Sequence, residues 1–200
     1  MEGVVKKSRL ILEAASAQAV APLLKMAVRY RRDLLVISSA GLVESTRLLR
    51  RAKRAGCRIS VPSGALGGID GVKAFSKGSI RKVILTTRKP PSSFSLKNLR
   101  RPKLLFAGPA RLAVRAFPQN VNVAATVLLS GVPSSKFRVR VIADPSLSRN
   151  AHELSVEGTE GLFFCRLESR PSENPKTSQS ALLSAVATLQ GLFETMHVGT

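Results

Sequence analysis

Short apolar segments of strand length alternate with helical patterns over the first 62 residues, and this alternation limits the folds that the chain can adopt. Helical patterns run from the first segment to about Tyr30 and again over about 44–55, after which Gly56 is a common helix-ending residue. The apolar segments are residues 9–14, 33–38 and 57–61. Apolar strands separated by helices are typical of a parallel sheet, since both faces of such a sheet are covered. We therefore predict an α/β fold that begins with a parallel sheet.

The pattern changes after Pro62. We predict helices over 67–77, 110–117, 121–129 and from Ser178 to about Met196, strands over 80–87, 137–143, 152–157 and 162–168, and a loop over 89–93. The last three strands follow one another without an intervening helical pattern, which indicates an antiparallel or mixed sheet. The second part of the chain is therefore predicted to be α+β, with the boundary between two domains, 1–62 and 63–200, at this point.

The chain carries a formal net charge of +20, from 32 Lys and Arg against 12 Asp and Glu, and no acidic residue occurs between Gly71 and Ala143. A field of this size attracts anions such as nucleic acid, a phosphorylated cofactor or a dicarboxylate. One Tyr and no Trp leave no stacking platform for bases, and no zinc-finger spacing occurs. Nucleic acid is therefore not the expected partner.

Several classes of protein are excluded by composition. Cys57 and Cys165 are far apart and belong to no cluster of metal-ligand residues, so neither a disulfide scaffold nor a metal site is expected. No apolar run reaches the roughly 18–20 residues of a membrane span, and the first seven residues are not a secretory signal. We expect no association with a membrane and a cytoplasmic location.

The sequence Gly-x-Gly-x-x-Gly, which binds a pyrophosphate between a first strand and helix, is absent, but a series of uncommon polar strings is present. In chain order they are Pro62-Ser-Gly-Ala-Leu-Gly-Gly-Ile-Asp70, Arg88-Lys-Pro-Pro91, Phe117-Pro-Gln-Asn-Val-Asn-Val-Ala124, Ala143-Asp-Pro145 with Asn150-Ala-His152, and Asn174-Pro-Lys-Thr-Ser178. This ordered set resembles the L-aspartate dehydrogenase family, from about residue 8 to about residue 190. The resemblance implies an enzyme that uses NAD or NADP to oxidise L-aspartate to iminoaspartate. It also implies a truncated, Rossmann-like dinucleotide-binding domain over 1–62, a catalytic and dimerisation domain over 63–200, and a homodimer.

The resemblance assigns roles to three residues. His152 is the expected catalytic acid/base, because an imidazole that titrates near neutrality can exchange a proton with the substrate amine or with the water that attacks the imine. Asn122 and the backbone of Ala65 are the expected cofactor contacts, at the nicotinamide. Without the resemblance, a lone strand histidine is more often structural, Asn122 could cap a helix, and Ala65 could lie in an ordinary tight turn.

A second group of residues is expected to bind the substrate. Lys176, Thr177 and Ser178 precede the last predicted helix, so a cation, two hydroxyls and free backbone N–H groups converge there on a candidate site for a carboxylate. Ordinary N-capping of the helix by Thr177 or Ser178 remains an equal alternative. Ser63 and Lys89 are lesser candidates for carboxylate contacts.

Members of the family begin with further residues that carry the glycine-rich turn, and three hypotheses follow. The chain is part of a full enzyme, and translation of the DNA upstream of Met1 should then reveal a strand followed by Gly-x-Gly-x-x-Gly. Alternatively, it is a degenerate, non-catalytic homologue, and these 200 residues alone should then show no aspartate-dependent NAD reduction. The third hypothesis is a basic nucleic-acid-binding protein, whose binding to DNA should fall steeply with salt.

Overall fold

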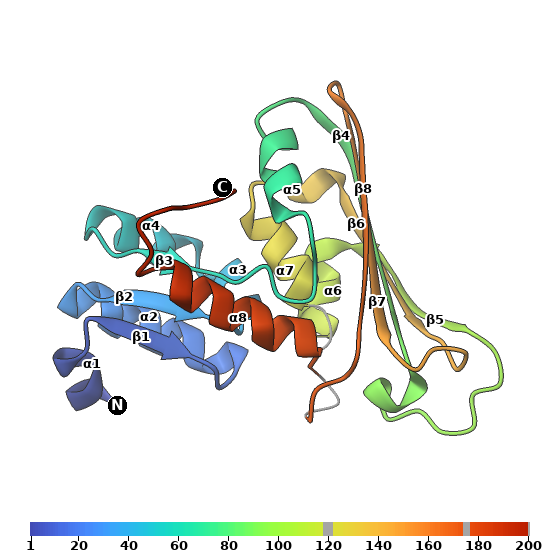
Figure 1. The fold of residues 1–200 in the computed structure, drawn as a ribbon, viewed down its shortest axis with the longest axis horizontal. Coiled ribbons are helices and arrows are strands. Elements are labelled where there is room, and N and C mark those ends of the chain that lie inside the picture. Colours follow the sequence, from blue (N-terminus) through green and yellow to red (C-terminus); the bar gives the residue numbers. More distant parts are fainter. Residues whose placement is uncertain (118–121, 174–176, 200) are drawn as a thin grey trace.

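The computed structural model describes residues 1–117, 122–173 and 177–199, and two separate sheets organise it (Figure 1). The first sheet is parallel and three-stranded, in the order β1-β2-β3. Its strands are β1 (Leu10–Glu13), β2 (Asp33–Val36) and β3 (Ile59–Ser60). The helices of this part are α1 (Glu2–Lys7), α2 (Ala17–Tyr30), α3 (Ala40–Val43) and α4 (Thr46–Arg54). The predicted parallel sheet is thereby confirmed.

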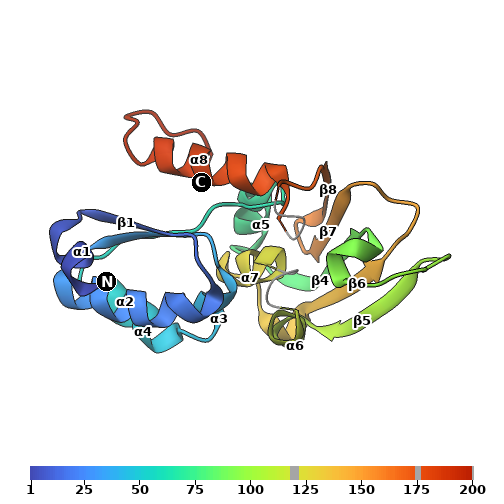
Figure 2. The same ribbon diagram turned by 90° about the horizontal axis from the view of Figure 1, so that it is seen from below.

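The central strand of the parallel sheet explains why its sequence is apolar throughout. Leu34, Leu35 and Val36 are at most 1% exposed, so both faces of β2 are covered. Helices α2 and α4 lie on one side of this sheet and α8 (Gln179–Gly191) lies on the other (Figure 2). The last helix thus lies beside the first part of the chain, and its Ser184 contacts the turn at Ser63 and Gly64.

The second sheet is mixed and five-stranded, in the order β5-β6-β4-β7-β8. Its central strand β4 pairs in parallel with β6 and antiparallel with β7, and the outer pairs β5–β6 and β7–β8 are antiparallel. The strands are β4 (Ile80–Lys89), β5 (Lys103–Pro109), β6 (Phe137–Ala143), β7 (Asn150–Gly158) and β8 (Gly161–Ser169). This arrangement confirms the predicted antiparallel or mixed sheet.

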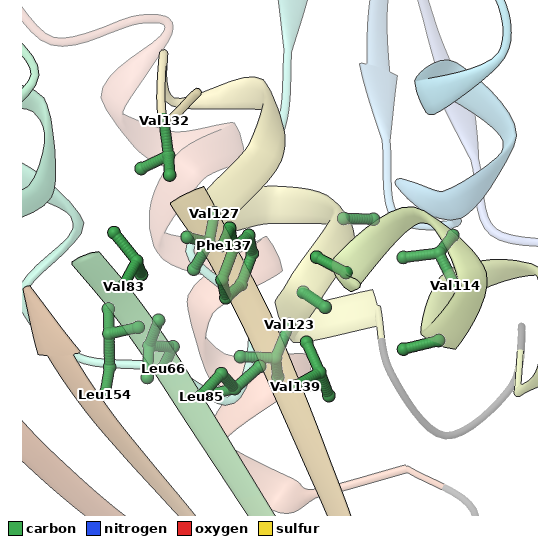
Figure 3. Packing of buried hydrophobic residues seen from close by; sticks show 14 of the residues in the cluster. Leu66, Val83, Leu85, Val114, Val123, Val127, Val132, Phe137, Val139 and Leu154 are labelled. Carbon is green, nitrogen blue, oxygen red and sulfur yellow. The ribbon is translucent and has the colours of Figure 1, made fainter. Parts of the chain in front are cut away.

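Three helices cover the face of the mixed sheet that is turned toward the parallel sheet (Figures 1 and 2). They are α5 (Ile69–Phe75), α6 (Ala110–Ala116) and α7 (Asn122–Leu129). Side chains of the sheet and of α7 form one buried cluster, which includes Leu85, Phe137, Val139, Val123 and Val127 (Figure 3). Because α7 also packs against α3, it connects this core to the parallel sheet.

Burial alternates along the strands of the mixed sheet, which distinguishes its two faces. On β8, Leu162 and Phe164 are 69% and 59% exposed, whereas Phe163 between them packs against the core. On β6, Arg138 and Arg140 are exposed while Val139 is fully buried. The residues Leu162, Phe164, Arg138 and Arg140 belong to what we call the outer face of the mixed sheet.

Several predicted elements differ from the observed ones. Strand β4 extends to Lys89, which was expected to begin a loop, because Lys89 pairs with Ala143 of β6. Strand β5 was not predicted, and the last helix ends at Gly191 rather than near Met196. The predicted helix 67–77 is confirmed in a shorter form as α5. Within the described ranges, no helix has the length and apolar character that crossing a lipid bilayer requires.

Candidate active site

A pocket of about 590 Å³ opens between the two sheets, at the carboxyl ends of the parallel strands. Its volume lies within the range of small-molecule sites, and the carboxyl edge is where open α/β sheets bind ligands. The lining residues come from both parts of the chain: Ala14, Ala15, Ser16, Ala17, Gln18, Ile37, Ser38, Ser39, Pro62, Gly64, Ala65, Lys89, Asn122, Val123, Thr126, His152, Thr177, Ser178 and Ala181. The pocket therefore brings together His152, Asn122, Ala65, Thr177 and Ser178 from the predicted site.

Glu13, at the end of β1, fixes the two strand-end loops of the pocket. Its carboxylate accepts hydrogen bonds from the backbone N–H groups of Ala15 at 2.8 Å, Ser16 at 3.0 Å and Ser38 at 3.0 Å. The side chain is only 2% exposed, and a buried carboxylate needs such donors. Glu13 thus ties the turn after β1 to the turn after β2.

Asn122 is the first residue of α7 and lies where α7 meets α3. Its side-chain Oδ1 accepts a hydrogen bond from the backbone N–H of Ala40 at 3.3 Å, and its backbone oxygen accepts one from the Ser39 hydroxyl at 3.1 Å. The amide therefore partners the first residue of a different helix, α3, while also lining the pocket. The side-chain bond is thus made to α3 and not to the start of α7, and the ligand contact stays a prediction.

His152 lies on β7 opposite Thr87 of β4 and is 1% exposed. The ring Nδ1 and the Thr87 hydroxyl oxygen are 3.0 Å apart, in hydrogen-bond contact. Burial, with a smaller contribution from the positive charge of Lys89, lowers the pKa of His152 to about 3. This lowered pKa favours the neutral ring in the ligand-free protein, and the role of His152 as acid/base stays a prediction.

Lys89 lies two residues beyond Thr87 on β4, on the same face, and also lines the pocket. It is 3% exposed, and burial lowers the pKa of its ammonium group to about 8. Such a lysine exchanges protons near neutral pH, whereas an exposed lysine stays charged.

Ser178 and Thr177 line the pocket just before α8. Ser178 occupies the N-cap position of α8, yet its hydroxyl makes no capping bond there; instead its Oγ accepts a hydrogen bond from the Asn150 side-chain amide at 3.0 Å. Simple N-capping by Ser178 therefore does not explain its position. The prediction for Lys176 lies outside the described residues.

Ala65 is 7% exposed and follows Gly64, whose φ of +70° favours glycine. The Ser184 hydroxyl of α8 accepts a hydrogen bond from the Gly64 N–H at 3.0 Å and lies 3.0 Å from the Ser63 hydroxyl. This contact fixes the turn beneath α8. Ser63 is thus engaged with α8 and is not among the residues that line the pocket.

The polar residues of the site that were not predicted include Glu13, Thr87 and Ser39. Glu13 is the one acid in an apolar strand, and Thr87 precedes Lys89 by two residues on one strand; both features are visible in the sequence. Neither feature indicates which residues Glu13 and Thr87 contact, because those residues come from other strands and loops. No group of three or more His, Cys, Asp or Glu side chains that could hold a metal occurs within residues 1–117, 122–173 and 177–199.

Known proteins with similar sequences share one description. The family described as "Aspartate dehydrogenase, C-terminal" matches residues 70–192. L-Aspartate dehydrogenase of Methanosarcina barkeri is 42% identical over 215 residues, which cover 100% of this chain and 79% of that protein. L-Aspartate dehydrogenase of Methanopyrus kandleri is 43% identical over 197 residues, covering 96% of this chain and 74% of that protein.

The fold is likewise similar to a solved one. The crystal structure of aspartate dehydrogenase from Thermotoga maritima matches with a TM-score of 0.82 at 26% sequence identity, covering 97% of this chain and 80% of that chain. These likenesses do not favour a basic nucleic-acid-binding protein. They include both the mixed sheet, which carries His152 and Lys89, and the parallel sheet, and so the chain belongs to the aspartate dehydrogenase family.

Proposed function

We propose that this chain catalyses the NAD(P)-dependent oxidation of L-aspartate to iminoaspartate. The observation that carries the proposal is the pocket between the sheets, which gathers the buried pair His152 and Lys89 with Asn122, Ala65 and Ser178. Membership of the aspartate dehydrogenase family supports the substrate and the reaction. A positively charged protein suits both the dicarboxylate and the cofactor phosphates.

The residues present fit a nicotinamide ring. Ala14, Ala15 and Ala65 give the pocket small side chains along the carboxyl ends of the parallel strands, where a flat ring can approach the backbone. Asn122 adds an amide that can donate to and accept from a carboxamide. When bound, the nicotinamide accepts the hydride from C2 of the substrate. Residues 1–62 would hold the dinucleotide and residues 63–200 would bind the substrate and form the dimer.

We propose that the substrate binds on the α8 side of the pocket. Thr177 and Ser178 offer hydroxyls before the first turn of α8, where a helix attracts a carboxylate. Lys176 would add a positive charge from the same segment. His152 exchanges a proton with the substrate amine or with the water that attacks the imine, and its contact with Thr87 holds the ring in one orientation.

The proposed activity is tested by the rate of NAD and NADP reduction with L-aspartate, measured on the purified full chain. D-Aspartate and L-glutamate serve as control substrates. We expect turnover with L-aspartate and a loss of at least about 100-fold in kcat for His152→Gln, the usual contribution of acid–base catalysis. A chain that binds neither cofactor nor L-aspartate would contradict the proposal and favour a non-catalytic homologue.

We also propose that two copies associate through the outer face of the mixed sheet. Leu162 and Phe164 expose apolar surface on β8, Arg138 and Arg140 make β6 basic, and Glu157 on β7 is acidic, whereas Arg166 on β8 pairs with Glu153 and Glu168. A two-fold axis can place the acidic Glu157 of one copy against the basic β6 of the other. The occupant of this face is therefore a second copy of the chain.

Sedimentation equilibrium tests this homodimer. We expect a dimer for the wild type, a monomer for Phe164→Glu, and a weakened dimer for Arg138→Glu. Arg50→Glu, on the exposed side of α4, is the matched control and should leave the dimer intact. A monomeric wild type at all concentrations would refute the assignment.

As a compartment we propose the cytoplasm, which suits the free thiols of Cys57 and Cys165.

A further inference from the structure

We propose that Lys89 is a second catalytic residue, the base that removes a proton from the α-ammonium group of the substrate. The inference rests on the proposed function and divides the proton transfers between two residues. Lys89 serves the ammonium group before oxidation, and His152 serves the water that attacks the imine afterwards.

The position of Lys89 is set by strand pairing. Its residue pairs with Ala143 of β6, and the Lys89 backbone oxygen accepts a hydrogen bond from the Asp144 N–H at 2.9 Å, so β4 is held to its last residue. Alternation along β4 directs Lys89 to the same face as Thr87, which is opposite His152. Lys89 and His152 thereby reach one pocket from neighbouring strands.

The charged groups near Lys89 that the structure describes lie on β4, β7 and the segment that follows β6. From β7 the titratable neighbour is His152, whose pKa the charge of Lys89 helps to lower. Arg88 points to the other face, and its guanidinium lies 3.6 Å from the Asp144 carboxylate, which also accepts a hydrogen bond from the Ser146 hydroxyl at 2.6 Å. The residues that line the pocket from α7 and α8 are uncharged: Asn122, Val123, Thr126 and Ala181.

The acidities of the two buried groups match this division. With a pKa of about 8, Lys89 is present both as amine and as ammonium near neutral pH, which suits a general base. Burial lowers the pKa of His152 to about 3, so its ring is the weaker base of the two. Lys89 is therefore the better acceptor of the two.

The step balances as follows in atoms and electrons. The lone pair of the neutral Lys89 amine bonds to one proton of the substrate ammonium, and the broken N–H bond leaves its electron pair on the substrate nitrogen. That pair forms the C=N bond while the Cα–H bond breaks and its pair departs as hydride. The substrate thereby loses two electrons to the nicotinamide, the oxidant of the proposed function. The Lys89 ammonium then returns its proton to water.

Two substitutions separate a base from a fixed positive charge. Lys89→Arg keeps the charge but cannot lose its proton at working pH, and Lys89→Met keeps the length of the side chain without charge. We expect the wild-type kcat/KM to rise through an ionisation near pH 8, and both variants to lose at least about 100-fold in kcat and to lose this ionisation from kcat/KM. Ethylamine should partly restore Lys89→Ala. Lys97→Met, at an exposed lysine, is the control and should retain the wild-type profile.

A measurement on the ligand-free protein completes the test. The pKa of the Lys89 side chain, followed by NMR in protein labelled with ¹³C-lysine, should be near 8, and melting curves verify that each variant folds. An active wild type whose Lys89→Arg variant keeps kcat and its pH profile, or a Lys89 pKa above about 10, the ordinary lysine range, overturns the inference alone. A wild type without aspartate-dependent NAD(P) reduction overturns the proposed function and, with it, the inference.

Discussion

At the scale of single residues, the unusual feature is a histidine and a lysine that share one buried pocket. His152 is 1% exposed and Lys89 is 3% exposed, and neither environment favours the charged form. A fold that buries ionisable groups in this way gives up stability in the pH range where they would otherwise be charged. The same burial tunes them for proton transfer, so stability and chemistry are coupled at these two positions.

This coupling predicts how acid affects folding. The unfolded chain binds a proton at His152 below about pH 6.5, whereas the folded chain binds it only below about pH 3, so the unfolded state gains stability as the pH falls between these values. Relative to His152→Gln, the wild type should lose about 1.4 kcal/mol of unfolding free energy per pH unit in this window. Urea denaturation at pH 7, 6 and 5 measures the difference. Parallel stability curves for the two proteins would show that His152 titrates normally.

At the scale of elements, the pocket depends on how loops and helices are fixed to one another. Glu13 joins the turns after β1 and β2, and Ser184 of α8 joins the turn that contains Gly64. Short α3 is placed close to α2 because Gly41 leaves room there. In each of these three contacts, one residue positions a whole loop or helix.

Glu13→Gln tests the contact that joins the turns after β1 and β2. An amide has the same size but cannot accept all three backbone N–H bonds, and bonds to a charged group contribute about 1.5–3 kcal/mol each. We expect a loss of about 1–3 kcal/mol in unfolding free energy and weaker cofactor binding, both measurable by denaturation and by titration calorimetry. Glu44→Gln is the control, because its side chain is 52% exposed and pairs with the surface arginines Arg111 and Arg115. An equal effect of both substitutions would contradict the role of Glu13.

Gly41→Ala tests the packing of α3 on α2. An added Cβ would lie 2.4 Å from the Ala17 backbone oxygen and 2.6 Å from the Val20 Cβ, so the helices must separate. We expect a loss of about 1–3 kcal/mol in thermal or urea unfolding, as is usual for overpacked cores. Gly191→Ala in α8, where nothing lies within 4 Å, should be neutral or stabilise by up to about 1 kcal/mol. A stable Gly41→Ala variant would mean that α3 is free to shift.

The elements also show what a sequence can predict here. Strand β6 was predicted at its observed bounds because its polarity alternates with no proline or glycine, whereas β5 was missed because it follows Arg100, Arg101 and Pro102 and ends in Gly-Pro. Family strings identified His152, Asn122, Ala65 and Ser178. They could not reveal the depressed pKa of His152 or the partners of Glu13, since both depend on contacts between distant segments.

At the scale of the whole molecule, two sheets with separate cores share one pocket. The packing of α7 on α3 and of α8 on the turn at Gly64 connects them. The chain carries a net charge of +20, and its pocket is proposed to receive two anions. We therefore expect the charge to raise the rate at which the ligands reach the protein, since its field extends further than any single contact.

Salt dependence measures this long-range effect. We expect kcat/KM for L-aspartate to fall severalfold between about 20 mM and 300 mM KCl, because added ions screen the attraction beyond roughly 10 Å. The value of kcat should change little, since bound substrate no longer depends on the distant field. An unchanged kcat/KM would mean that the surplus charge plays no part in capture of the substrate.

The pairing of β4 with β7 has a consequence for how this protein can vary. Thr87 faces His152 across these strands, and Lys89 follows on the same side. A slip of one residue would turn His152 to the outer face and replace it in the pocket by Ala151 or Glu153, without altering a single side chain. The irregular pairing between Ile80 and Lys82 lies at the far end of β4, where an added residue leaves the site unshifted. We therefore expect insertions and deletions to be tolerated at that end and to abolish activity between Thr87 and Lys89.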